Sequence, residues 1–208
     1  MIETLRLDSR IKFGKDEMAE HLITPKVIRV NQFTEEAVEK FSADMSEASQ
    51  EGQEIIPIVI DTEGGDPYSL FAMVDLIESS EIPVATIVEG KAFSCGAVLF
   101  CCGAKGYRFM GPNSTLMIHD VMSCDENIKK TKEVVTDALE TNRLNKKLYQ
   151  IIDRGIGKPT GYTQAFVQKR GRSDWYLTPQ QSLKLGYTNH ISIPRVQCTV
   201  SVSTQLIF

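Results

Sequence analysis

The sequence alternates short apolar runs with segments in which apolar residues recur at helical spacing. The clearest apolar runs are Ile55–Ile60, Val84–Val88 and Thr115–His119. Between the first two, Ser69–Ser79 carries an apolar residue every three or four positions, which is typical of an amphipathic helix. Strands joined by helices of this length pair in parallel through right-handed crossovers. The pattern therefore predicts an α/β fold built on a parallel sheet.

The same criteria place further elements along the chain. Thr34–Gln50 is expected to be a helix with Thr34 as its N-cap, because threonine can accept a hydrogen bond from a free N–H of the first turn. We expect strands at Lys26–Asn31 and around Tyr107–Met110, and a helix at Leu177–Leu185. Alternation of apolar and polar residues after Ile191 predicts a half-buried strand there.

Composition narrows the class of protein. With 208 residues and 42% hydrophobic residues, the chain is long enough for one globular domain with an adequate core. A net charge of −4 argues against nucleic acid as a partner, and no apolar stretch is long enough to span a bilayer. The five cysteines show no C-x-x-C spacing, which suits a reducing, cytoplasmic location.

Ser94 lies between the Val84–Val88 run and the apolar helical run Ala97–Cys101, at an expected strand-to-helix corner. The small residues Ala92 and Gly96 make this a relaxed form of the G-x-S-x-G nucleophile elbow, in which a sharp turn exposes the serine Oγ. A serine at this position can also act only as the N-cap of the helix. The sequence leaves both interpretations open.

His119 and Asp174 are the candidate partners of Ser94. His119 ends an apolar strand, so its imidazole can reach a cleft, and a neutral imidazole is the usual base for a serine hydroxyl. Asp174 is the best candidate for the carboxylate that orients the imidazole, with Asp120 and Asp125 as the nearest alternatives. The alternative is that both residues have purely structural roles. His119 would then be a hydrogen-bonded histidine at the end of a strand, and Asp174 would assist the start of the next helix.

Gly64 and Gly65 follow the strand Ile55–Ile60 and precede a helix. Lacking side chains, they let a substrate approach the backbone closely. The N–H groups of Gly65 and Cys95 are the predicted donors to an oxyanion. An ordinary turn is the alternative, and a phosphate loop is disfavoured because G-x-G-x-x-G and a G-K-[ST] ending are absent. Cys95 as the nucleophile is a weaker third idea.

Four groups of residues in this order resemble the motifs of ClpP, the proteolytic subunit family of the Clp protease. They are Asp61-Thr-Glu-Gly-Gly65, Ala92-Phe-Ser-Cys-Gly-Ala97, Gly103-Ala-Lys-Gly106 with Pro112-Asn-Ser114 and Met117-Ile-His119, and Ser173-Asp174 with Leu177-Thr-Pro-Gln-Gln181 and Leu185-Gly186. The resemblance extends from about Val27 to Gly186. It implies a serine endopeptidase with catalytic residues Ser94, His119 and Asp174.

The resemblance also implies a crotonase-like fold of stacked βαβ units with a protruding helical handle. The implied division is an N-terminal axial or gating segment at 1–26, a head domain at 27–122 and 154–208, and a handle region at 123–153 whose helix is Asn127–Asp153. The amphipathic pattern of that segment suits a long helix.

For assembly, the resemblance implies a homo-oligomer of seven-membered rings stacked in pairs. Its substrates would be peptides and unfolded proteins, and a separate AAA+ unfoldase would consume ATP, because this chain has no Walker motif. The docking site for that unfoldase is divergent, because Val59 and Ser79 stand where the family places aromatic residues. The chemistry requires no cofactor or metal. One departure from the family is that Arg172 lies one position farther from Asp174 than the family's arginine, so ring stacking is expected to be weaker or differently controlled.

Two other classes of protein remain as alternatives. One is a catalytically silent subunit that fills a structural position in a mixed ring, and the other is a crotonase-type enzyme acting on an acyl-CoA. The intact set Ser94, His119 and Asp174 argues against the first, and the second would need acidic residues in place of a serine.

Overall fold

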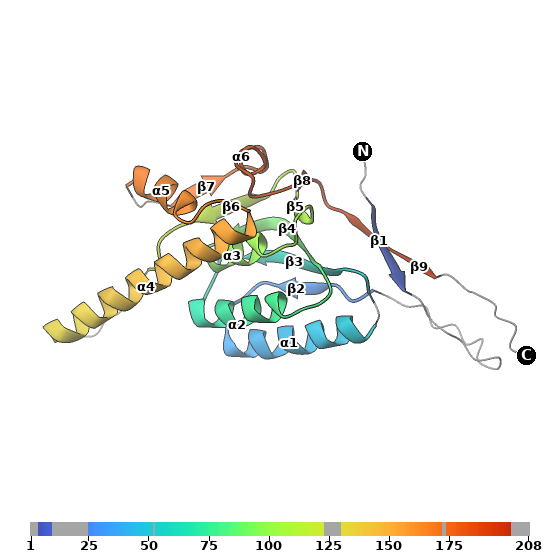
Figure 1. Cartoon of the computed structure of the whole chain (residues 1–208), viewed down its shortest axis with the longest axis horizontal. Coiled ribbons are helices and arrows are strands. Elements are labelled where there is room, and N and C mark those ends of the chain that lie inside the picture. The colour runs from blue at the N-terminus through green and yellow to red at the C-terminus, as the bar shows by residue number, and fades with distance from the viewer. Residues whose placement is uncertain (1–3, 10–24, 52, 123–129, 172–173, 201–208) are drawn as a thin grey trace, which may run out of the picture.

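The computed structural model describes residues 4–9, 25–51, 53–122, 130–171 and 174–200 (Figure 1). Its centre is a seven-stranded sheet in which five strands form a parallel row. In sheet order these are β2 (Ile28–Val30), β3 (Ile56–Thr62), β4 (Val84–Phe93), β5 (Arg108–Met110) and β8 (His190–Ile191). The predicted α/β class with a largely parallel sheet is confirmed.

Strand β4 extends beyond the predicted Val84–Val88 run and pairs with two further strands. Its first part pairs in parallel with β5, and Lys91–Phe93 pair in parallel with β6 (Thr115–Ile118). Gly90 lies between the two parts with φ 79°, a left-handed conformation that glycine adopts at no steric cost. The polar residues around Gly90 made the strand look shorter in the sequence than it is.

The remaining strand of this sheet, β7 (Trp175–Leu177), pairs antiparallel with β6. The sequence did not predict it, and the helix expected to begin at Leu177 begins two residues later, as α6 (Pro179–Leu185). Thr178 caps α6 by accepting a hydrogen bond from the N–H of Gln181. A second element not predicted is the short helix α5 (Tyr162–Lys169).

Two helices lie side by side against one face of the sheet (Figure 1). They are α1 (Glu35–Gln50) and α2 (Pro67–Glu78). Thr34 caps α1 as predicted, because its hydroxyl accepts a hydrogen bond from the N–H of Ala37 at 3.2 Å. The apolar residues expected on the core side of α2, Leu70, Met73, Val74 and Ile77, are all buried.

The long helix α4 (Thr131–Gly155) projects beyond the sheet in Figure 1. One face of its second half, from Leu144 onward, is buried against α3 (Cys95–Cys101) and the core, whereas Val134, Val135 and Leu139 in the first half are exposed. This is the helix expected within the handle region. Residues 123–129 of that region lie outside the described part of the chain.

At the opposite end of Figure 1, β1 (Thr4–Ser9) and β9 (Arg195–Val200) pair in parallel as a two-stranded ribbon. The strand predicted after Ile191 is therefore present, and its partner comes from the first residues of the chain. Most of the expected gating segment at 1–26, and residues 201–208, lie outside the described part of the chain.

Arg108 is buried where three helices end. Its guanidinium donates to four backbone carbonyls: that of Gly103 just after α3, that of Gly155 at the end of α4, and those of Gly186 and Tyr187 after α6. The side chain is 3% exposed. A cation at helix C-termini is favoured by the partial negative charge of the unpaired carbonyls there. One side chain thus joins α3, α4 and α6 to β5.

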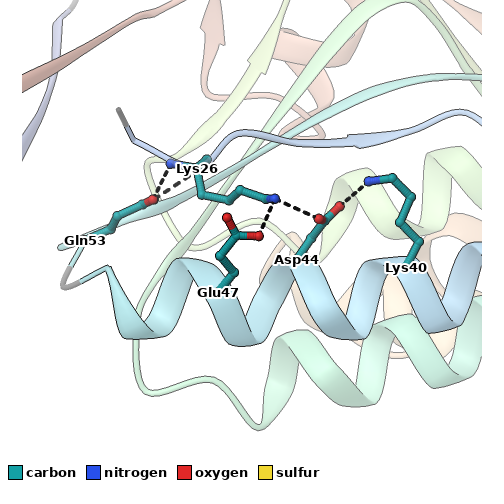
Figure 2. Close-up of polar contacts among 5 residues, drawn as sticks. All are labelled: Lys26, Lys40, Asp44, Glu47 and Gln53. Atoms are coloured by element: carbon teal, nitrogen blue, oxygen red, sulfur yellow. Dashed lines mark hydrogen bonds and ion pairs between the residues drawn. The ribbon is translucent and has the colours of Figure 1, made fainter. Parts of the chain in front are cut away.

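Ion pairs attach the start of β2 to α1 (Figure 2). Lys26 Nζ lies 3.0 Å from Asp44 Oδ1, and Lys40 Nζ lies 2.5 Å from Asp44 Oδ2. The backbone N–H of Lys26 donates to Gln53 Oε1. Burial alone would raise the pKa of the Asp44 carboxyl, but the hydrogen bonds and charges of Lys40 and Lys26 outweigh it and hold that pKa below its usual range.

We expect Asp44→Asn to lower the free energy of unfolding by about 1–2 kcal/mol near neutral pH, because it removes a charged acceptor from a mostly buried site. Since the folded-state pKa of Asp44 is depressed, its contribution is complete above the unfolded-state pKa and is lost as the pH falls through the folded-state pKa. The free energies of unfolding of the wild type and of Asp44→Asn, measured with urea, should therefore converge as the pH is lowered.

Glu47→Gln is the matched control for this measurement. Glu47 pairs with the same Lys26 but its side chain is 54% exposed, so its loss should change stability little. A difference in the free energy of unfolding between wild type and Asp44→Asn that does not vary with pH would contradict the stabilising role of the Asp44 carboxylate.

Candidate active site

Ser94 lies between β4 and α3 in a strained backbone conformation. Its φ is 54° and its ψ is −118°, and it is the one residue other than glycine with positive φ in the described part of the chain. Such a conformation costs on the order of 1–3 kcal/mol and persists only where the surroundings enforce it. Here the Ser94 N–H donates to the carbonyl of Met117 at 2.9 Å, and its own carbonyl accepts from the N–H groups of Ala97 and Val98.

The Ser94 side chain makes no capping hydrogen bond to α3. The backbone of Ser94 therefore starts the helix, but its hydroxyl does not serve as the cap. This geometry removes the support for the capping interpretation and agrees with a nucleophile elbow.

Gly64 and Gly65 pass directly beside Ser94. Gly64 has φ 114°, and a Cβ built on it would lie 2.8 Å from Ser94 Cβ and 3.3 Å from Ser94 Oγ. A Cβ on Gly65 would lie 2.8 Å from the carbonyl oxygen of Phe33. Both positions require glycine because of close approach, so this turn has less freedom of sequence than an ordinary one.

Ser94, His119, Gly65 and Cys95 all line one cavity of about 270 Å³. Much of the remaining wall is apolar and comes from α3, β6 and α4, with Val98, Ile118, Leu148 and Ile152. Glu63 lies at this cavity too, and its carboxylate pairs with Lys91 at 2.8 Å. The structure thus brings four of the five sequence-predicted site residues to one cavity.

The fifth predicted residue, Asp174, contacts His119. Asp174 Oδ1 lies 3.3 Å from His119 Nδ1, and the two side chains are 48% and 9% exposed. Strand pairing accounts for the contact: Ile118 of β6 lies opposite Trp175 of β7 in an antiparallel pair. In such a pair the residue after Ile118 must face the residue before Trp175. The unpredicted strand β7 is therefore what brings Asp174 to His119.

The other two carboxylates considered for His119 are accounted for differently. Asp120 Oδ1 accepts a hydrogen bond from the hydroxyl of Tyr149 on α4, at 2.5 Å. Asp125 lies outside the described residues. Of the carboxylates described, Asp174 is the one that pairs with the imidazole.

Cys95 is buried, and its Sγ donates to the carbonyl oxygen of Gly65 at 3.2 Å. Burial raises the pKa of this thiol to about 11, so the thiolate is scarce near neutral pH. Cys95 is therefore unsuited to act as the nucleophile. Its side chain instead ties the start of α3 to the Gly64-Gly65 turn.

Two residues on α4 escaped the sequence interpretation. Asn145 and Tyr149 are buried, and both hydrogen bond to the residues that follow His119. The helical spacing of apolar residues around them indicated a buried face, but not what that face contacts. Within the described residues, no group of three or more histidine, cysteine or acidic side chains could hold a metal ion, and no helix has the length and apolarity to cross a membrane.

A sequence model of the family described as Clp protease matches residues 14–195 of this chain. The chain belongs to the Clp protease family. The resemblance to ClpP drawn from the sequence motifs is thereby confirmed.

Two curated relatives are both described as an ATP-dependent Clp protease proteolytic subunit. The one from Porphyromonas gingivalis is 32% identical over 136 residues, which are 65% of this chain and 59% of the relative. The one from Streptococcus mutans is 29% identical over 143 residues, 69% of this chain and 71% of the relative. The match thus spans about three fifths of the length of the first relative.

Among solved structures, a ClpP1 mutant from Listeria monocytogenes has a similar fold. Its TM-score is 0.71 with 21% sequence identity, over 84% of this chain and 94% of that one. At this identity the likeness concerns the fold alone. It confirms the ClpP-type architecture for this Clp protease family member.

We expect Asp174→Asn to leave the fold intact and to lower peptide turnover by roughly a thousandfold or more, because the imidazole loses the carboxylate that fixes its tautomer. The measurement is kcat on a short fluorogenic peptide, with circular dichroism to verify folding. Turnover near that of the wild type would mean that a carboxylate other than Asp174 orients His119.

Proposed function

We propose that this chain is a serine endopeptidase of the ClpP type, with Ser94 as nucleophile, His119 as base and Asp174 as the orienting carboxylate. The observation that carries the proposal is the His119–Asp174 pair at the cavity beside a backbone-strained Ser94. Membership of the Clp protease family supports it. The relatives' description as proteolytic subunits supports peptide bonds as the target.

In the proposed reaction, Ser94 Oγ attacks the scissile carbonyl carbon while His119 accepts the hydroxyl proton. The imidazolium is stabilised by Asp174, and it then donates the proton to the leaving amine. Water then attacks the acyl-enzyme while His119 accepts its proton. Return of that proton to Ser94 Oγ releases the second product and restores the free serine. No cofactor or metal takes part in these steps.

The developing oxyanion needs donors that already point at it. We assign this role to the backbone N–H groups of Gly65 and Cys95, which flank Ser94 at the cavity. The hydrogen bond from Cys95 Sγ to the Gly65 carbonyl holds the two donor segments together. The apolar wall from α3, β6 and α4 favours an apolar substrate side chain next to the scissile bond.

We expect Ser94→Ala to abolish cleavage of short peptides, a loss of at least about a thousandfold, because the attacking atom is removed. The matched control is Ser79→Ala, which removes an exposed hydroxyl at the end of α2. Labelling with a fluorophosphonate probe is the second measurement. Wild type and Ser79→Ala should be labelled, and Ser94→Ala should not.

Retained turnover in Ser94→Ala, purified free of host peptidases, would overturn the assignment of the nucleophile. A wild-type protein that neither turns over peptide nor takes up the probe would instead support a silent structural subunit. Binding of an acyl-CoA thioester in place of peptide would support crotonase-type chemistry.

For assembly, we propose a homo-oligomer of seven-membered rings stacked in pairs, working with a separate AAA+ unfoldase on unfolded proteins in the cytoplasm. The relatives' description as ATP-dependent supports the unfoldase, because this sequence has no Walker motif. The exposed residues Val134, Val135 and Leu139 on the projecting half of α4 support stacking through that helix.

We expect dilution to dissociate the particle and to lower peptidase activity in parallel, by mass action. Sedimentation velocity across a dilution series, with turnover measured on the same samples, provides the test. Leu139→Glu should move both transitions to higher protein concentration. Lys146→Glu changes an exposed charge on the same helix and is the control. An active monomer at every concentration would contradict the ring and the role of α4.

A further inference from the structure

We propose that Asn145 and Tyr149, one helical turn apart on α4, are positioning residues that fix the backbone after His119 and thereby place its imidazole for catalysis. The proposal rests on the peptidase function proposed above. It gives the buried half of α4 a part in the reaction that the three predicted catalytic residues do not reveal.

The backbone before His119 is fixed by the sheet. Met117 of β6 pairs with Phe93 of β4, and Ile118 pairs with Trp175 of β7. The Met117 carbonyl also accepts a hydrogen bond from the N–H of Ser94. Strand β6 is therefore bonded to the backbone of the nucleophile and leads directly to the base. Strand β6 ends at Ile118, however, and the ladder does not hold the residues that follow.

The backbone after His119 is held by α4 instead. The N–H of Val121 donates to Asn145 Oδ1 at 2.7 Å, and the hydroxyl of Tyr149 donates to Asp120 Oδ1 at 2.5 Å. Asn145 is 8% exposed and Tyr149 is 3% exposed, so the α4 side of each bond is shielded from water. Residues four apart share one helical face, which lets both side chains reach consecutive residues of the same segment.

These contacts act on the imidazole from two sides of His119. Strand β6 sets its position from the N-terminal side, and the two bonds to α4 set it from the C-terminal side. Loss of either α4 bond would free the backbone next to the base, and a displacement on the order of 1 Å can cost about a hundredfold in rate. Tyr149 hydrogen bonds to Asp120, and Asp174 is the carboxylate that pairs with His119.

The test uses variants that remove one bond each and keep the side-chain volume. We expect Tyr149→Phe and Asn145→Leu each to lower kcat roughly tenfold while KM changes little, since they disturb the placement of the base rather than the binding of substrate. The labelling rate of Ser94 by a fluorophosphonate should fall by a similar factor. Thermal unfolding of each variant verifies that the folded state persists.

Tyr68→Phe is the matched control, because Tyr68 also donates its hydroxyl to a carboxylate across an α4 contact, that of Glu140. The hydrogen bond that this variant removes is to α4 itself and not to Asp120 or Val121, so the kcat of Tyr68→Phe should equal that of the wild type. Asp120→Asn is the rescue variant: an amide oxygen still accepts from Tyr149, and kcat should remain close to that of the wild type. Asp120→Leu removes the acceptor and should behave as Tyr149→Phe does.

A spectroscopic readout separates this proposal from the peptidase assignment. In protein labelled with ¹³C-histidine, the imidazole resonance of His119, assigned by its loss in His119→Gln, should shift in Tyr149→Phe and Asn145→Leu but not in Tyr68→Phe. An unshifted resonance with unchanged kcat overturns the positioning role. A shifted resonance in a protein that lacks all turnover and labelling supports positioning and overturns the peptidase function.

A loss in Asp120→Asn as large as that in Asp174→Asn would also overturn the proposal. It would show that the charge of Asp120, and not its hydrogen bond to Tyr149, is what His119 requires.

Discussion

The arrangement of the site depends on one buried cation. The guanidinium of Arg108 joins the C-terminal ends of α3, α4 and α6 through four backbone carbonyls. Each of these helices contributes to the site: α3 follows directly after Ser94, α4 lines the cavity, and α6 follows the strand next to Asp174. Without this side chain, the carbonyls at the helix ends would be buried without hydrogen-bond donors. An apolar side chain of similar size at position 108 would therefore lower the stability of the fold.

Much of the framework could be predicted from local sequence, because local chemistry determines it. Thr34 caps α1 through a hydrogen bond from a residue three positions away, and the apolar spacing in α2 identifies its buried face. Both features depend on residues that are close in sequence. Trp175–Leu177 differ, since three residues become a strand only by pairing with β6. Gly161, which precedes the first residue of α5, has φ 94° and offers no capping side chain, so this helix lacks the usual start signal.

Residue types at the site could likewise be selected from sequence, whereas their geometry could not. Ser94 follows from its corner position, but its φ of 54° is imposed by contacts with Met117 and the start of α3. Asp174 could be chosen over Asp120 only as a hypothesis, because the choice depends on a strand that the sequence does not reveal. The sequence predicts Tyr149 only as an aromatic residue of the core. The role of its hydroxyl becomes clear only from the structure, which places Asp120 within hydrogen-bond distance.

The ribbon of β1 and β9 pairs two strands that are separated in sequence by the whole seven-stranded sheet. Because β1 is synthesised long before β9, the intervening domain can fold before the two strands meet. A folded domain brings the two strands close and removes most of the entropy cost of closing so long a loop. We therefore expect the ribbon to form last, on a sheet that is already in place.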